Sequence, residues 1–135
     1  MKSSFIIALL LFLSLTATSQ CSKINFINTS LSFAYNKAQQ ESKSIFVFLY
    51  EENDPKANFF QSAIFYKNDI CTIFNDKFIN VKAKKDSSIG MEIINQHNIT
   101  NFPSFIILDR NRFLKYQSST ILNSMDLIRF AEQER

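Results

Sequence analysis

Cysteine is scarce in this chain, which has only Cys21 and Cys71 and no cysteine between them. A Cys-x-x-Cys pair, whose low-pKa thiolate attacks disulfides, is therefore absent. The sequence also lacks an uninterrupted run of about 20 apolar residues, the length that a membrane-spanning helix requires. No linker, internal repeat or low-complexity segment divides the chain, and its 135 residues suffice for one domain at most.

A large excess of one charge is missing as well. The chain has 15 Lys and Arg against 12 Asp and Glu, which gives a formal net charge of +3. Its one basic cluster, formed by Lys82, Lys84 and Lys85, has no aromatic residues interleaved with it, whereas a nucleic-acid-binding face is broader. We therefore expect no nucleic-acid partner. We interpret the cluster as solvated residues that discourage pairing at a sheet edge.

The first 20 residues have the pattern of a secretory signal peptide. Lys2 precedes an apolar run at residues 5–15, and small and polar residues follow as far as Gln20. Ala17 and Ser19 stand where small residues precede a cleavage site. The sequence thus predicts a signal peptide at 1–20, a mature domain at 21–135, and export to the periplasm or the cell exterior.

The two cysteines leave alternatives open. Cys21 directly follows the predicted signal peptide, where bacterial lipoproteins carry the cysteine that takes a lipid, although Gln20 replaces the usual small residue before it. A lipidated Cys21 would bring the protein to a membrane and would exclude a disulfide. Cys71 lies in a short apolar stretch expected to be helical, so a buried free thiol is the simplest expectation. An exported protein could instead pair the two cysteines.

Hydrophobic periodicity predicts strands and helices in alternation, with a hairpin near the end. Alternation implies parallel strands joined by crossover helices, and the hairpin adds antiparallel strands. The sequence therefore predicts an α/β domain with a mixed sheet and helices on both faces. The strands are expected at residues 23–28, 45–50, 78–83, 103–109 and 113–116, and the helices at 31–43, 56–66, 68–74, 88–97 and from 124 onward, with Ser30, Asp54, Ser87 or Ser88, and Asn123 or Ser124 as N-caps.

A proline opens the fourth of these strands. Proline donates no ladder hydrogen bond, so within a sheet it is confined to edges, bulges or the first residue of a strand. The Phe102–Pro103 bond, between an aromatic residue and this proline, is a candidate for a cis peptide.

With this order of elements and a proline at this position, the chain resembles the thioredoxin-like superfamily from about residue 23 to residue 132. It looks most similar to secreted bacterial thioredoxin-like proteins that have a second short helix after the active-site helix. The resemblance implies a central sheet of about five strands, a cis Pro103, and a substrate groove lined by Phe102, Pro103 and Ser104.

The departure from that family is at the active site. The resemblance places its Cys-x-x-Cys at the start of the second helix, where this chain has Asp54, Pro55, Lys56 and Ala57. A helix N-terminus lowers the pKa of a thiol, but no thiol is present here to be activated. We therefore expect no dithiol chemistry. Cys71, one helix further on and flanked by isoleucines, is expected to be inert.

Other chemistry-bearing residues are isolated. Glu51, Glu52 and Asp54 could offer oxygen ligands to a hard cation, but helix-start electrostatics with Asp54 as N-cap is the better interpretation. His97 has no second histidine or cysteine near it in sequence, so we interpret it as a helix-end residue favoured by the helix dipole. Ser104 lacks the partners of a nucleophile. We expect no cofactor and no metal.

The phenylalanine-rich composition suggests a binding surface. We expect most of the aromatic residues to form the core, and a group near the vacated site to leave an apolar groove. The leading hypothesis is an exported, non-catalytic domain that binds a polypeptide or partner protein through that groove. The alternative is a redox protein that uses a single cysteine, Cys71 or Cys21. The aromatic residues expected around the vacated site are Phe59, Phe60, Phe65, Tyr66 and Phe102.

Overall fold

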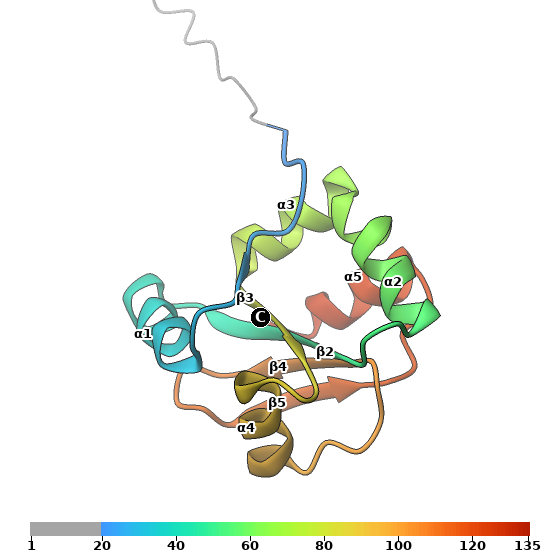
Figure 1. Cartoon of the computed structure of the whole chain (residues 1–135). Coiled ribbons are helices and arrows are strands. Elements are labelled where there is room, and N and C mark those ends of the chain that lie inside the picture. Colours follow the sequence, from blue (N-terminus) through green and yellow to red (C-terminus); the bar gives the residue numbers. More distant parts are fainter. Residues whose placement is uncertain (1–19) are drawn as a thin grey trace, which may run out of the picture.

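A five-stranded mixed sheet is the centre of the molecule (Figure 1). The computed structural model describes residues 20–135; the predicted signal peptide lies outside them except for Gln20. The spatial order of the strands is β1-β3-β2-β4-β5. β2 runs parallel to β3 and antiparallel to β4, and β5 pairs antiparallel with β4 at the edge. The strand bounds are β1 Phe26–Ile27, β2 Ser44–Tyr50, β3 Phe78–Lys84, β4 Ser104–Leu108 and β5 Leu114–Ser118.

Helices cover both faces of the sheet, as the sequence predicts (Figure 1). One layer contains α1 and α4, and the opposite layer contains α2, α3 and α5. None of the helices within residues 20–135 is long and apolar enough to cross a membrane. The bounds of the helices are α1 Leu31–Glu41, α2 Pro55–Ser62, the 3-10 turn η2 Ile64–Tyr66, α3 Asn68–Lys77, α4 Ser88–His97 and α5 Ser124–Glu132.

Alternation along β2 supplies the two halves of the core. Ile45, Val47 and Leu49 face α1 and α4, whereas Phe46 and Phe48 face the opposite helices. All five side chains are fully buried, as expected for a strand at the centre of a sheet covered on both sides. The α2 side is dominated by aromatic rings that contact one another edge-on, tilted or, for Phe46 and Phe105, stacked. These rings include Phe46, Phe48, Phe60, Phe65, Phe74 and Phe105.

The predicted N-caps are confirmed at four helices. The side chains of Ser30, Asp54, Ser87 and Asn123 each accept a hydrogen bond from a backbone N–H in the first turn of the helix that follows. Each cap satisfies one of the backbone donors that have no partner within the helix.

Several element lengths differ from the prediction. The strand expected at residues 23–28 contracts to the two residues of β1, because the chain before it crosses toward η2 instead of following β3. The helix expected at 56–66 is divided into α2 and η2, and α3 continues to Lys77. In α5, Met125 is exposed and Phe130 takes a place in the core.

Candidate functional site

The start of α2 has the capping chemistry of a helix terminus and no sulfur. Asp54 Oδ2 accepts a hydrogen bond of 2.9 Å from the backbone N–H of Ala57. Pro55 occupies the first turn, where its missing N–H has no consequence. Lys56 donates to the carbonyl of Ser119 at 3.2 Å, and Ala57 is fully buried in the core. These four positions therefore fix the helix to its surroundings, and none of them offers a thiol.

The two cysteines form a disulfide, which corrects the expectation of a free Cys71 thiol. Cys71 is fully buried near the start of α3, and its sulfur is bonded to that of Cys21. The described residues 20–135 thus hold no free thiol. A redox mechanism that uses a single cysteine requires a reactive thiol, and in this structure both cysteine sulfurs are in the disulfide. A lipidated Cys21 is incompatible with it as well, because the Cys21 sulfur is already bonded.

The disulfide attaches an N-terminal strap, which we define as residues 21–25, to α3, and hydrogen bonds attach it to α3 and η2. Asn75 of α3 holds the strap next to the disulfide: its Oδ1 accepts from the backbone N–H of Asn25 at 2.8 Å, and its Nδ2 donates to the carbonyl of Lys23 at 3.0 Å. The backbone N–H of Ile24 donates to the carbonyl of Phe65 at 3.0 Å. This role of Asn75 could not be predicted from the sequence, because a single side chain that binds two distant backbone groups leaves no local pattern.

The loop before β4 contains Pro103, which the sequence predicts at the start of this strand. The peptide bond between Phe102 and Pro103 is cis. Pro103 and Ser104 are buried, and the Ser104 hydroxyl donates to the carbonyl of Asn101 at 2.6 Å. Ser104 is also paired with Leu49 in the sheet. The Ser104 side chain is therefore occupied inside the protein, and Phe102 is the more accessible member of the predicted groove.

Phe102 combines a half-buried ring with a free backbone. Its N–H and C=O take part in none of the hydrogen bonds found among residues 20–135. Its ring packs against the cluster on the α1 and α4 side, and the Lys85 ammonium lies 5.5 Å from the ring centroid. This separation is within the range of a cation–π contact. Phe102 thus presents an aromatic edge, a cation and two unpaired backbone groups at one end of the sheet.

The aromatic cluster expected around the vacated site does not form as a unit. Phe60 and Phe65 are buried on the α2 side of the sheet, whereas Phe102 packs on the opposite side. Phe59 and Tyr66 point largely to solvent. The sequence could not separate these residues because aromatic content does not reveal which face of the sheet each ring occupies.

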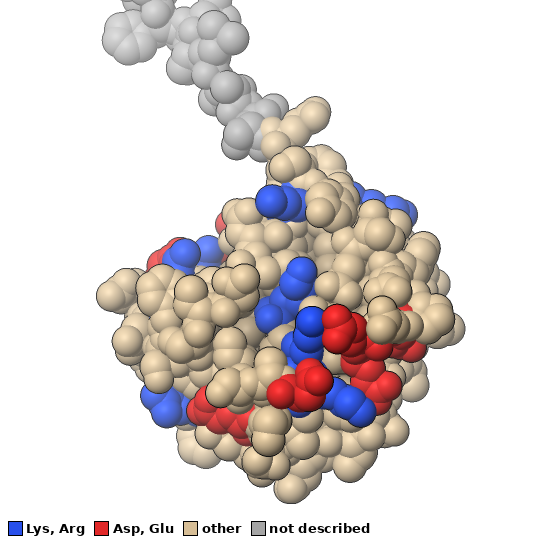
Figure 2. Space-filling model, in the orientation of Figure 1, with Lys and Arg blue, Asp and Glu red and all other residues tan. Residues whose placement is uncertain are grey.

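Two ion pairs cross between the β2–α2 loop and the end of β3. Lys84 pairs with Glu52 and Lys85 pairs with Glu51, each at 3.0 Å, and Figure 2 shows acidic and basic side chains gathered on this face. The hydrogen bond that Lys84 donates to Glu52 raises the pKa of Lys84, while burial raises the pKa of Tyr50 at the end of β2. The acidic loop thus pairs with two lysines of the cluster that the sequence predicts to be solvated.

Comparison with known proteins rests on the fold. No family model matches the sequence, and no curated protein matches it either. Among solved structures, a protein from Bacteroides thetaiotaomicron assigned as a disulphide-isomerase has a TM-score of 0.72 at 18% identity, covering 87% of this chain and 99% of that one. A thioredoxin from Thermus thermophilus has a TM-score of 0.68 at 12% identity, covering 84% and 87%. The chain has the thioredoxin-like fold.

A third solved structure carries the same conclusion. A disulphide isomerase from Xylella fastidiosa Temecula1 has a TM-score of 0.65 at 9% identity, covering 85% of this chain and 100% of that one. These likenesses confirm the predicted fold. The thioredoxin-like fold by itself does not assign an activity, because function depends on the residues of the site. In this chain the candidate residues are Asp54 and Ala57 at the helix start and those of the Phe102–Pro103 loop.

His97 ends α4 on the side opposite to α2. Its Nε2 is buried with no hydrogen-bond partner within the described residues, and burial lowers its pKa from the ordinary value of 6.5. Burial thus disfavours the charged imidazolium, the form that the expected interaction with the helix dipole would favour. His97 and the start of α2 belong to different layers of the fold, and the structure does not bring them together.

Proposed function

We propose that this protein is an exported thioredoxin-fold domain that binds a polypeptide in extended conformation beside Phe102 and does not exchange disulfides. The observation that carries the proposal is a contrast between two loops. The start of α2 has a capping carboxylate and a buried alanine where a thiol pair would be needed, whereas the Phe102–Pro103 loop keeps an unpaired backbone N–H and C=O.

Backbone pairing explains how binding persists without sulfur. An extended peptide can donate to and accept from free backbone groups at the end of a sheet, and neighbouring side chains then select its sequence. Phe102 supplies apolar contact, whereas Lys85 beside its ring is already paired with Glu51 and adds no free charge that would select an acidic segment. The partner is therefore expected to be an unstructured or flexible polypeptide and not a nucleic acid.

Export is supported by two observations of different kind. The first 20 residues have the sequence pattern of a signal peptide. The Cys21–Cys71 disulfide is of a type that persists in oxidising compartments outside the cytoplasm. Both observations favour a periplasmic or extracellular location.

Binding can be tested with peptides that contain no thiol. We would measure the affinity of residues 21–135 for an array of unstructured peptides, and compare wild type with Phe102→Ala. Loss of a central aromatic contact is expected to weaken the tightest binders about five- to thirty-fold. Phe113→Ala, the same substitution at a ring that is 68% exposed in the β4–β5 turn, serves as the matched control.

The expected absence of disulfide exchange can be measured directly. Wild type should not accelerate the reduction of insulin disulfides by dithiothreitol. An acceleration comparable to that of a thioredoxin, or equal peptide binding by wild type and Phe102→Ala, would show the proposal to be wrong.

A further inference from the structure

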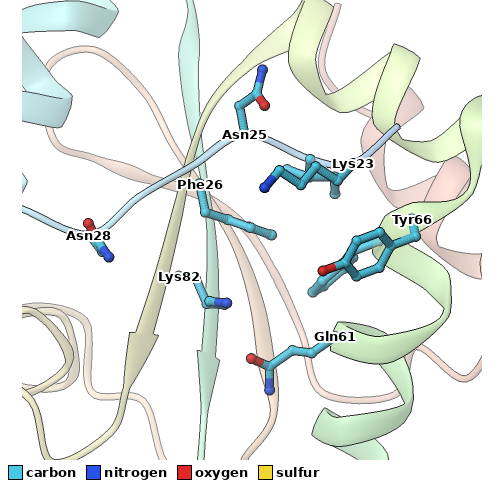
Figure 3. Close-up of a pocket in the computed structure, with 9 residues that line it drawn as sticks. Lys23, Asn25, Phe26, Asn28, Gln61, Tyr66 and Lys82 are labelled. Atoms are coloured by element: carbon cyan, nitrogen blue, oxygen red, sulfur yellow. The ribbon is translucent and has the colours of Figure 1, made fainter. Parts of the chain in front are cut away.

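A second surface feature is independent of the Phe102 loop. A pocket of about 370 Å³ lies between the N-terminal strap and the outer side of α2 and η2 (Figure 3). This volume is at the lower end of the range for small-molecule sites. None of the groove residues Phe102, Pro103 and Ser104 contributes to it. The pocket is lined by Lys23, Ile24, Asn25, Phe26, Asn28, Gln61, Phe65, Tyr66 and Lys82.

The shortness of β1 opens this pocket. β1 pairs only with Asn80 and Val81 of β3. Lys82, the next residue of β3, therefore has no strand beside it on the β1 side. The Lys82 side chain is half-buried and reaches the pocket from the sheet. In Figure 3, Lys23 reaches the pocket from the strap and Phe26 from β1, while Gln61 and Tyr66 reach it from α2 and η2.

The charge in the pocket has no counterion from the protein. Lys23 and Lys82 contribute two ammonium groups, and none of the nine lining residues is Asp or Glu. Neither lysine takes part in an ion pair within residues 20–135, whereas Lys84 and Lys85 nearby are paired with glutamates. Unpaired cations in a concave, partly enclosed site attract anions.

The remaining lining is apolar and amide-rich. The rings of Phe26 and Phe65 meet edge-to-face with centroids 5.2 Å apart, and the Lys82 ammonium lies 5.5 Å from the Phe26 ring centroid. The Tyr66 hydroxyl and the side-chain amides of Asn25 and Asn28 have no hydrogen-bond partner within residues 20–135. An occupant would therefore meet aromatic rings, neutral polar groups and two cations.

One wall of the pocket is held in place before any ligand arrives. The strap is fixed by the Cys21–Cys71 disulfide, by the two hydrogen bonds of Asn75 and by the bond from Ile24 to Phe65. A wall that is already ordered loses little conformational entropy when a ligand binds.

We propose that this pocket binds an organic carboxylate that carries an aromatic ring, with the carboxylate between Lys23 and Lys82 and the ring against Phe26 and Phe65. The same chemistry is present in a free aryl acid and in the C-terminal residue of a peptide that ends in phenylalanine. Because the site is small and open to solvent, we expect a Kd on the order of 1 mM for the smallest ligand.

The test is an NMR titration of residues 21–135 with 3-phenylpropionate, and with 3-phenylpropanamide as the neutral analogue. The acid should shift the backbone resonances of Asn25 and Lys82 in a saturable manner, and higher salt should weaken its binding. The amide should bind several-fold more weakly. Equal affinity of acid and amide, or shifts that do not centre on the pocket, would overturn the proposal.

Substitutions separate charge from folding. Lys82→Met should weaken the acid several-fold, whereas Lys82→Arg should retain most of the affinity. Lys67→Met is the matched control, since Lys67 is exposed beside Tyr66 but does not line the pocket. An unchanged affinity in a folded Lys82→Met variant would overturn the proposal.

The source of the ligand is identified by comparing 3-phenylpropionate with Gly-Gly-Phe and its C-terminal amide. Tighter binding by the peptide acid assigns a chain terminus, and tighter binding by 3-phenylpropionate assigns a free aryl acid.

Discussion

Cys21 and Cys71 are 50 positions apart in the sequence, and their disulfide brings their Cα atoms to 5.9 Å. The bond joins the N-terminal strap to the first turns of α3, on the side of the sheet where α2, α3 and α5 pack. Cys71 is fully buried, so the attachment point is within the core and not on a flexible surface. The only two sulfur atoms that cysteine provides to this chain thus stabilise its structure.

Removing the disulfide is expected to destabilise the protein by roughly 3–4 kcal/mol, because a closed loop of this length restricts the unfolded chain strongly. The variant Cys21→Ser/Cys71→Ala should show a lower urea midpoint than wild type, and wild type should approach it when reductant is added. Intact mass with and without reductant provides the check: the disulfide-bonded form gains two hydrogen atoms on reduction. Identical midpoints for wild type and the double variant would contradict the role assigned here.

Asn75→Ala is expected to release the strap while leaving the disulfide intact. The substitution removes the partners of two backbone groups, the N–H of Asn25 and the carbonyl of Lys23, and should cost about 1–2 kcal/mol. Hydrogen exchange at the Asn25 amide is the direct measurement and should accelerate. Asn95→Ala, at an exposed position of α4, is the matched control and should change neither quantity. Unaltered exchange at Asn25 in the Asn75 variant would contradict the clamp.

The fold could be predicted from the sequence because its signals are local and repeated. The continuous apolar run of β2, the capping residues Ser30, Asp54 and Asn123, and Pro103 at the start of β4 are each visible within a few residues. Together they determine the order of the elements, and that order leaves few topologies.

The contacts of the strap and of Phe102 could not be predicted, because they join distant segments. The pairing of Cys21 with Cys71 depends on where the strap crosses α3, and the placement of Phe102 depends on which face of the sheet its ring meets. The structural requirement for Gly90, the only glycine, could not be predicted from the sequence either. A Cβ at this position would overlap the carbonyl oxygen of Lys84, a contact that no local pattern reveals.

Introducing two thiols at the start of α2 tests whether the cysteine pair is what the site lacks. The variant Asp54→Cys/Ala57→Cys places thiols at the N-cap and in the first turn, where the helix N-terminus lowers a thiol pKa. We expect it to reduce insulin disulfides with dithiothreitol at a rate clearly above that of wild type. Asp54→Ser/Ala57→Ser, with hydroxyls at the same atoms, is the control and should be inactive. A folded double-cysteine variant without activity would show that the site lacks more than sulfur.

Protonation of His97 should weaken the protein under mildly acidic conditions. Burial lowers the pKa of His97 in the folded state below the value of 6.5 that it has when exposed, so the unfolded state binds the proton first as the pH falls. Stability therefore decreases from about pH 7.5 down through the folded-state pKa, and then no longer changes on account of this residue. The measurement is the free energy of unfolding of wild type and of His97→Gln at several pH values across this window. Subtracting one curve from the other removes the contribution of the carboxylates. As the pH falls, the free energy of unfolding of wild type should decrease relative to that of His97→Gln, because the variant loses no stability through this group. A difference that is constant with pH would mean that His97 titrates alike in both states, and that solvent reaches its ring in the folded protein.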